Sequence, residues 1–253
     1  MHNFCLLFEE LKQLLGMVKE ESRNHGIYLN LKKTKIICNS QLEEFLLDGE
    51  SIEVVESFNF LGSTIHMDGS IETELRKRLS LGRTAMTKLK PIMKNHDVTL
   101  NTKVMIVTSM VFPVVLYGAE SWTLNLQFKR KLNAFELWCW RRVLHITWKQ
   151  KVTNEEVIRR IAPKITLEAT ALKQKLTYFG HVMRSKNGMG REIMLGKTEG
   201  KRRRGRQRTR WIEDVKNSTG RSLAELKEIS LNRSGWRRVV HNVTRGRPRP
   251  DGL

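Results

Sequence analysis

Cysteine is scarce in this sequence, and its placement argues against the folds that depend on it. Cys5, Cys38 and Cys139 are the three cysteines among 253 residues, and no two of them form a C-x-x-C pair. Disulfide frameworks and cysteine-rich zinc modules both need paired or closely spaced thiols. The scattered cysteines therefore indicate a reducing compartment, which we expect to be nuclear or cytoplasmic.

Long apolar runs are also missing. The most hydrophobic stretch, residues 104–119, contains Thr108, Ser109 and Pro113. It is shorter than the roughly 20 apolar residues that a bilayer-spanning helix needs. The chain opens on an amphipathic pattern with two glutamates, which is not the pattern of a secretory leader. We expect a buried helix at residues 104–119, no leader and no membrane partner.

Motifs of several enzyme classes are missing as well. The sequence has no G-x-x-x-x-G-K-[ST] loop, and no Ser, His and Asp surround a nucleophile elbow. His181 lacks further ligands at the spacing of a zinc site, so we interpret it as structural or RNA-contacting. The sequence thus predicts no metal site, and no small-molecule substrate is evident.

Positive charge is what the sequence has in excess. It contains 46 Lys and Arg against 26 Asp and Glu, for a net charge of +20 and a pI of about 10.2. Residues 184–253 hold 20 of the basic and 7 of the acidic side chains, so +13 of the +20 lies there. Charge of this size cannot neutralise itself, and it indicates a polyanionic partner, above all nucleic acid.

Local patterns predict a mainly helical α+β fold whose strands lie in the first part of the chain. Apolar residues at steps of three and four run from Phe4 to Val18, and Gly26 supplies a left-handed stop. Asp48-Gly49 predicts a hairpin. We also expect a basic strand segment over residues 29–35, a short strand over 34–39, and a strand over 58–65 that ends at Asp68-Gly69.

From about residue 71 the apolar spacing becomes helical. We expect a long helix that Pro91 bends or ends, and capping boxes at Thr153 and Ser222 open two further helices. Glycine and arginine dominate after residue 184, where we expect a partly disordered basic segment. The predicted divisions are residues 1–70, 71–184 and 185–253, with further helices near 102–117, 127–146, 172–183, 210–216, 223–229 and 236–243.

Six stretches, taken in order, carry a resemblance to a known family. They resemble the C-terminal part of a non-LTR (LINE-type) retrotransposon reverse transcriptase, an RNA-directed DNA polymerase. The stretches are LNLKKTK (29–35), FNFLGS (58–63), LYGAESW (116–122), LWCWRR (137–142), YFGHVMR (178–184), and GKRRRGR (200–206) followed by WIED (211–214).

The resemblance implies a role for each part of the chain. Residues 1–70 would be the end of the palm and the primer grip, and residues 71–184 the thumb, whose basic helix faces follow template and primer. Asn30 and Lys33 would lie near the phosphates of the incoming nucleotide. The hairpin of Phe60, Leu61, Gly62 and Ser63 would hold the 3′ end of the primer, and the basic segment would engage target DNA or element RNA.

The departure from the family concerns catalysis. Polymerases hold Mg²⁺ ions between clustered aspartates, and the family has an aromatic-Ala-Asp-Asp turn before the helix that corresponds to residues 4–25. No Asp-Asp pair occurs in this sequence. We therefore predict no catalytic residue and no cofactor in this chain, with Mg²⁺ expected only for the complete enzyme, so the chain should be inactive alone.

Basic side chains are the candidate contacts to RNA, DNA or an RNA–DNA hybrid. Trp138 and Trp140 could stack on bases, or one of them could pack in the core. The cluster at residues 201–210 fits phosphate binding or nuclear import, and RGRPR at 245–249 resembles a minor-groove AT-hook. The candidates are Arg76, Arg78, Arg83, Arg141, Arg142, Lys201, Arg202, Arg203, Arg204, Arg206, Arg208, Arg210, Arg245 and Arg247. A host-used nuclear DNA- or RNA-binding protein and a non-functional translated remnant remain alternatives.

Overall fold

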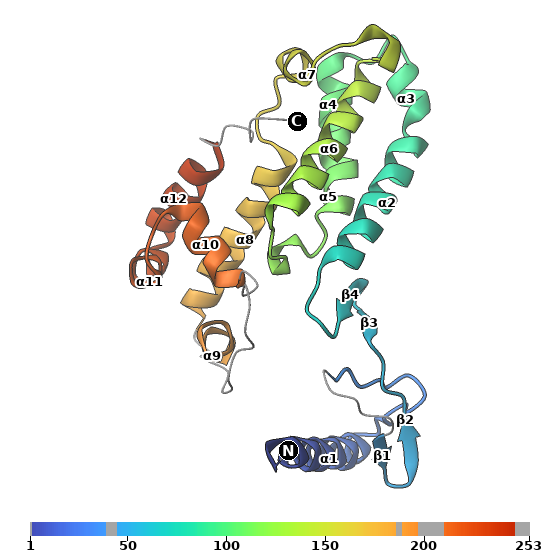
Figure 1. Cartoon of the computed structure of the whole chain (residues 1–253), viewed down its shortest axis with the longest axis vertical. Coiled ribbons are helices and arrows are strands. Elements are labelled where there is room, and N and C mark those ends of the chain that lie inside the picture. Colours follow the sequence, from blue (N-terminus) through green and yellow to red (C-terminus); the bar gives the residue numbers. More distant parts are fainter. Residues whose placement is uncertain (1, 39–44, 186–188, 197–209, 246–253) are drawn as a thin grey trace. The chain divides into compact units, whose positions relative to one another are not determined.

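A computed structural model describes residues 2–38, 45–185, 189–196 and 210–245 (Figure 1). The chain divides into two compact units, Met1–Glu74 and Leu75–Leu253. The described residues form many helices and two short antiparallel hairpins, so the mainly helical α+β fold is confirmed. No helix among them is both long enough and apolar enough to cross a membrane.

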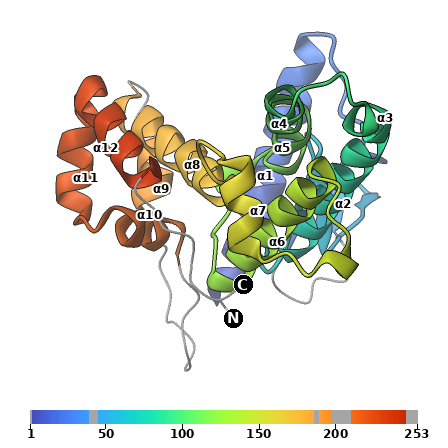
Figure 2. The same cartoon turned by 90° about the horizontal axis from the view of Figure 1, so that it is seen from above.

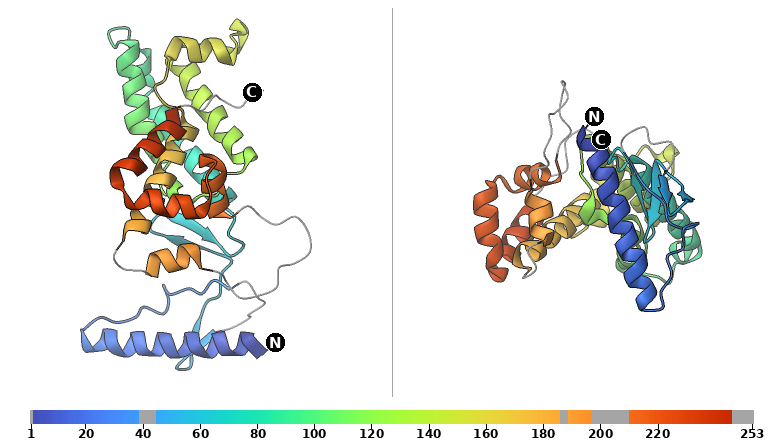
Figure 3. Two further views of the ribbon diagram at one scale, coloured as in Figure 1. Left: turned by 90° about the vertical axis from the view of Figure 1, so that its left-hand side faces the viewer. Right: turned by 90° about the horizontal axis from the view of Figure 1, so that it is seen from below.

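The first unit is built on a long helix and a small hairpin. Helix α1 (His2–Asn24) ends before Gly26, whose φ of 71° is the expected left-handed stop. Strands β1 (Phe45–Leu47) and β2 (Glu50–Ile52) pair around Asp48-Gly49, which confirms the predicted hairpin. Phe45, Leu47 and Ile52 are buried against Phe8, Leu11 and Leu15 of α1, which lies beside the hairpin (Figure 3).

A second hairpin splits the strand expected over residues 58–65. Strands β3 (Ser57–Phe60) and β4 (Ser63–His66) pair with Phe60 opposite Ser63. Leu61 and Gly62 both have positive φ, at 48° and 83°, which defines a two-residue type I′ turn. Every residue from 57 to 66 is exposed or half-buried, so packing beneath the hairpin contributes little to its stability.

The strands predicted over residues 29–35 and 34–39 are wrong for the described residues. Residues 31–33 form a turn, and only Ile36 bridges Val54. The Asn30 side chain explains the difference, because its Oδ1 accepts the Lys33 N–H at 3.1 Å. Asparagine commonly closes turns in this way, and the turn removes backbone groups from any ladder.

The second unit begins with helices that pack through a glycine. Helix α2 (Glu72–Lys88), which starts in the first unit, is followed at Pro91 by the short α3 (Lys90–Lys94), as expected. Gly82 of α2 faces Val115 and Phe135, and a Cβ there would lie 2.3 Å from Val115 Cγ2. Phe135 belongs to α6 (Leu126–Val143), so the missing side chain lets α2 approach that helix closely.

The apolar helix expected over residues 102–117 forms, with one irregular turn. It consists of α4 (Leu100–Ile106), a π turn η1 (Val107–Val111) and α5 (Phe112–Val115). The Phe112 N–H donates to Val107 O, five residues back. Pro113 has no N–H to give to the regular α-helical pattern, and the widened turn directly precedes it.

The remaining helices surround α8 (Leu167–Arg184), which lies between α6 and a C-terminal group (Figure 2). Leu176 and Phe179 of α8 share a core with Val215, Leu226 and Trp236. Residues on both sides of position 184 therefore contribute to one core. The domain boundary that we expect at residue 184 stays a prediction. The other elements are η2 (Ala119–Ser121), η3 (Trp148–Gln150), α7 (Asn154–Ile161), α9 (Met189–Leu195), α10 (Trp211–Thr219), α11 (Leu223–Leu231) and α12 (Arg233–Arg245).

Candidate nucleic-acid interface

The predicted primer-grip residues lie at the tip of the β3–β4 hairpin. Phe60 is 54% and Leu61 76% exposed, so the tip presents apolar side chains to solvent. Leucine rarely adopts positive φ, because its Cβ crowds the backbone there. Glu74 contacts the hairpin close to its tip, since its carboxylate accepts the N–H of Thr64, which pairs with Asn59 beside the turn, at 2.7 Å. The hairpin therefore combines an exposed, strained turn with an anchoring contact on the adjacent strand.

Asn30 and Lys33 occupy one exposed turn in the same unit. The Asn30 carbonyl and side-chain oxygens both accept the Lys33 N–H, at 3.0 and 3.1 Å. The Lys33 side chain is exposed, and it is available to an anion. Their proximity to a nucleotide stays a prediction.

The three candidate arginines of α2 differ in their exposure to solvent. Arg76 and Arg83 are exposed, as expected of the outer face. Arg78 is only 7% exposed, and its guanidinium lies 4.3 Å from the centroid of the Tyr117 ring. The outer position that we expected for Arg78 is therefore wrong, because a cation–π contact with Tyr117 holds its side chain against the protein.

The two tryptophans of α6 lie in different environments. Trp140 is fully buried, and its Nε1–H donates to Glu136 Oε1 at 3.0 Å. Trp138 is half-buried, and the Arg142 guanidinium lies 4.2 Å from its ring centroid. The core explanation thus holds for Trp140, while Trp138 and Arg142 form a ring–cation pair at the surface.

Arg141 has a local structural contact. Its guanidinium donates to Asn154 Oδ1 at 2.9 Å and to Val152 O at 2.8 Å. These bonds fix the start of α7 against α6, and the side chain is half-buried. A contact between Arg141 and nucleic acid stays a prediction, but two of its donors are already used.

Arg83, Trp138 and Arg142 together form what we call the α2/α6 patch. Gly82 contacts Phe135, and Phe135 stacks on Trp138 with centroids 5.6 Å apart. Burial raises the pKa of the Cys139 thiol and Glu136 raises it further, whereas Arg142 and Arg83 both lower it. Both guanidiniums therefore act on one thiol of α6, and the patch joins two exposed cations to a partly exposed aromatic ring.

The candidates near the C-terminus are only partly described. Lys201, Arg202, Arg203, Arg204, Arg206, Arg208 and Arg247 lie outside the described residues, as do the clusters that they form. Arg210 is exposed and directly precedes α10, and Arg245 is the exposed last residue of α12. Binding by this group stays a prediction.

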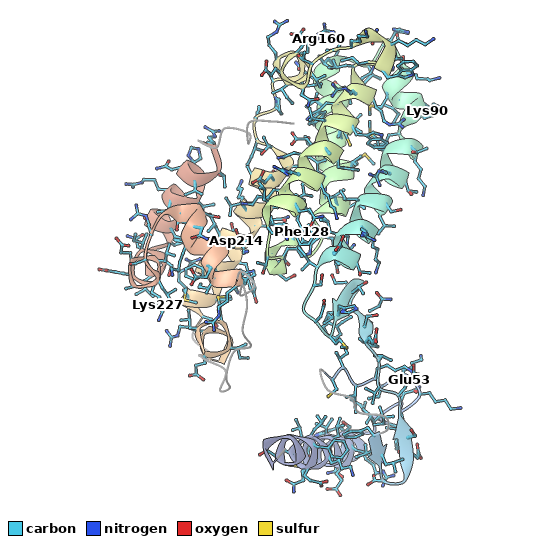
Figure 4. The ribbon with its side chains drawn as sticks, in the orientation of Figure 1. Glu53, Lys90, Phe128, Arg160, Asp214 and Lys227 are labelled. Carbon is cyan, nitrogen blue, oxygen red and sulfur yellow. The ribbon has the colours of Figure 1, made fainter. Side chains whose placement is uncertain are left out.

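A buried ion pair that the sequence did not predict joins two of the family-like stretches, 116–122 and 211–214, through α8. Lys175 of α8 and Asp214 of α10 are buried, with Nζ 2.5 Å from Oδ2 (Asp214 is labelled in Figure 4). Lys175 also donates to Trp122 O at 2.8 Å, and the Trp211 Nε1–H donates to Glu120 O at 2.8 Å. We call this group the buried hub. The sequence offers one sign of this ion pair, a lysine at a position of α8 that the helical period places in the core. Its partner could not be identified from the sequence, because it lies 39 residues away.

Within the described residues, no group of three His, Cys, Asp or Glu side chains is placed to hold a metal ion. The side chains described here therefore do not fit the pair of Mg²⁺ ions that a polymerase uses.

The chain is similar to a transposon-derived protein over nearly its whole length. It is 23% identical over 251 residues to an uncharacterized transposon-derived protein of Caenorhabditis elegans, which covers 92% of this chain and 89% of that protein. No family model matches the chain. No solved structure matches it.

Proposed function

We propose that this chain is part of a retrotransposon-type RNA-directed DNA polymerase, and that it binds nucleic acid without extending it. The similarity to a transposon-derived protein supports the origin. The order of the six stretches supports the finer assignment to a LINE-type enzyme. The α2/α6 patch is the observation that carries the binding, because it exposes charge and an aromatic ring together on the helical unit.

The patch has the chemistry that a sugar–phosphate backbone requires. The guanidiniums of Arg83 and Arg142 can each neutralise a phosphate and release its counterions. Phe135 stacks on the Trp138 ring and Arg142 lies over it, so the exposed part of Trp138 can make apolar contact with a sugar or base beside the phosphate that Arg142 binds. A net charge of +20 adds long-range attraction that brings nucleic acid to this surface.

Neutralising the patch should weaken binding and reduce its salt dependence. For Arg83→Gln/Arg142→Gln we expect the Kd for a short RNA–DNA hybrid to rise about tenfold at moderate salt. The slope of log K against log salt should fall by about 1.8, which is 0.9 for each lost phosphate contact on a duplex. Fluorescence anisotropy of a labelled hybrid over a salt series measures both quantities.

A matched control removes two exposed arginines from another surface. In Arg221→Gln/Arg238→Gln the net charge falls equally, and both side chains are exposed. We expect its Kd to stay within about twofold of the unchanged protein, since no specific contact is lost. Equal weakening in the two variants would contradict the patch and indicate unspecific attraction of a polyanion.

The second prediction of the proposal is that the chain does not polymerise. A template–primer with all four deoxynucleotides and Mg²⁺ or Mn²⁺ should give no extended product, because the sequence has no Asp-Asp pair and the described residues hold no acidic cluster to position the metal ions. Primer extension read on a denaturing gel measures this, with an active reverse transcriptase as the positive control. Template-dependent product from the purified chain would overturn the inactive assignment and leave the binding assignment standing.

A further inference from the structure

A basic cleft of about 550 Å³ lies between α8 and α12, apart from the α2/α6 patch. Six of its lining residues are lysine or arginine, two are histidine, and none of the described lining residues is acidic. Arg245, His181 and the Arg184 that ends the stretch YFGHVMR are the lining residues already named from the sequence. The basic and histidine residues are Lys164, Lys173, His181, Arg184, Arg233, Arg237, His241 and Arg245.

The spacing along the two helices explains how these side chains meet. On α12, residues 233, 237, 241 and 245 recur every fourth position, so Arg233, Arg237, His241 and Arg245 share one face. The adjoining face of α12 supplies Trp236 and Val240 to the core, and both residues also line the floor of the cleft. The α12 row extends over about 18 Å, at 1.5 Å per residue.

The other wall of the cleft belongs to α8. Lys173, Thr177 and His181 are exposed at steps of four, and Arg184 follows one turn later. Trp236 packs closely against Gly180, where a Cβ would lie 2.2 Å from its Nε1, and it donates to Leu176 O. These contacts hold α12 against α8, so the walls are positioned without any ligand.

The described residues do not neutralise the positive charge in the cleft. Burial lowers the pKa of Arg184, and the nearby Arg233 and Arg237 lower it further. The Arg184 guanidinium is held in place by Ser230 O, to which it donates at 2.7 Å. Among the described residues, none of the six lysines and arginines of the cleft forms an ion pair, so their mutual repulsion is left unrelieved.

Other surface cations of the same unit do have acidic partners. Arg159 and Arg160 both pair with Glu156, and Lys216 pairs with Glu213. Mixed charges are therefore found on the outer faces of α7 and α10, and the cleft differs from them. Gathering like charges in a cleft raises the potential there and favours an anionic ligand.

We propose that the α8/α12 cleft binds the sugar–phosphate backbone of a single-stranded nucleic acid. The volume is that of a site for a small ligand, so a few nucleotides of one strand can enter it, whereas a duplex can touch only its rim. The row of cations follows the helix axes and can contact successive phosphates. The cleft deepens the proposed function, on which it rests, by adding a separate site for a single strand.

The test compares the full chain with variants of the two walls. Arg233→Gln/Arg237→Gln removes two exposed charges from α12, and Lys173→Gln removes one from α8. Arg221→Gln/Arg238→Gln is the matched control, because Arg238 is exposed on the same helix but does not line the cleft. The probes are a labelled oligo(dT), a labelled oligo(U) and an RNA–DNA hybrid, with polyglutamate as competitor and circular dichroism as the folding check.

We expect the α12 double variant to bind the single strands about tenfold more weakly, with a salt slope reduced by about 1.4, or 0.7 for each contact. Lys173→Gln should weaken them about threefold, and the control by less than about twofold. Binding of the hybrid should change far less in the cleft variants. Comparable losses for oligo(dT) and oligo(U) indicate a backbone contact, and a loss for one of them alone assigns the cleft to DNA or RNA.

Several results would overturn the cleft site. These are equal weakening in cleft and control variants, competition by polyglutamate as effective as that by the strand, or no binding of single strands by the unchanged protein. The proposed binding by the α2/α6 patch is tested separately: an unchanged Kd of Arg83→Gln/Arg142→Gln for the hybrid would contradict it. The patch and the cleft are therefore tested by different variants and different nucleic-acid probes.

Discussion

Asp214→Ala is expected to lower the free energy of unfolding by about 3–5 kcal/mol, because it leaves the buried ammonium of Lys175 without a counterion. Lys175 is fully buried, and its ion pair with Asp214 is the contact that offsets this burial. Asp214 also accepts the Leu124 N–H, at 3.4 Å. Urea unfolding followed by circular dichroism measures the loss.

The pH dependence identifies Lys175 as the cause. Burial lowers the pKa of Lys175 below its ordinary 10.5, and Asp214 acts in the opposite direction. Without Asp214 the pKa of Lys175 falls further, so the unfolded state binds more protons than the folded state up to about pH 10.5. The stability deficit of Asp214→Ala should therefore shrink as the pH rises from neutrality toward that value, and it should lose this pH dependence in Asp214→Ala/Lys175→Met.

Glu213→Ala is the matched control for this prediction. Glu213 precedes Asp214 on α10 and pairs with Lys216, but that pair is partly exposed. Exposed pairs contribute about 0–1 kcal/mol, so the loss should stay in that range. A loss in Asp214→Ala no larger than in Glu213→Ala would contradict the buried hub.

The buried hub also shows what the family-like stretches do in this chain. Trp122 ends one of them, and Trp211 and Asp214 lie in another. Tyr178 and Phe179 of a third both contact the Trp211 ring. These residues hold the helical unit together.

Local signals were enough to place most helices and one hairpin. Capping boxes were expected at Thr153 and Ser222, and both side chains accept the N–H of the residue three positions on, Glu156 and Glu225. The Glu225 carboxylate completes the box at Ser222, whereas the Glu156 carboxylate accepts from Arg159 and Arg160 instead. Asp48-Gly49 was expected as a turn, and it is one. In each case the decisive interaction spans two to four residues, so it is visible in a short window of sequence.

Long-range contacts could not be predicted in the same way. Arg78 borders the apolar seam of α2, three residues after Leu75, but the Tyr117 ring that covers it comes from another element. Lys175 and Asp214 meet only because α8 and α10 pack together. The basic residues of α12 are visible in the sequence at steps of four. The cleft itself exists only because α8 faces this row of α12.

Helix α6 shows the same limit in its core. The predicted seam, which includes Leu132, Phe135 and Cys139, is buried as expected. Glu136 is buried too, although an acidic residue on a helix with many charges suggests a solvated position. The difference arises because α4, α7 and α8 all contact α6, so more than one face of it is covered.

Glu136→Ala is expected to lower the free energy of unfolding by roughly 2–5 kcal/mol, since each buried donor left without a partner costs about 1–3 kcal/mol. The Glu136 carboxylate accepts the Trp140 Nε1–H and the Leu167 N–H, both at 3.0 Å. Leu167 is the first residue of α8, so the carboxylate also faces the partial positive charge of that helix end. Urea unfolding measures the loss.

Two control variants show whether the loss of stability comes from the buried hydrogen bonds of Glu136 or only from its negative charge. Glu136→Gln keeps one acceptor oxygen and nearly the same volume, so its loss should be smaller, about 1–2 kcal/mol. Glu155→Ala removes an exposed carboxylate from the first turn of α7, and its loss should stay within about 1 kcal/mol.

Cys139 offers a local readout of the same change. Its thiol is buried on α6 one turn from Glu136, and burial raises its pKa, so it is protected from alkylation in the folded protein. With Cys5 and Cys38 replaced by serine, Glu136→Ala should increase the rate of Cys139 alkylation, because the open state is more populated. Unchanged alkylation together with a loss no larger than that of Glu155→Ala would show that the Glu136 bonds do not stabilise the junction of α6 and α8.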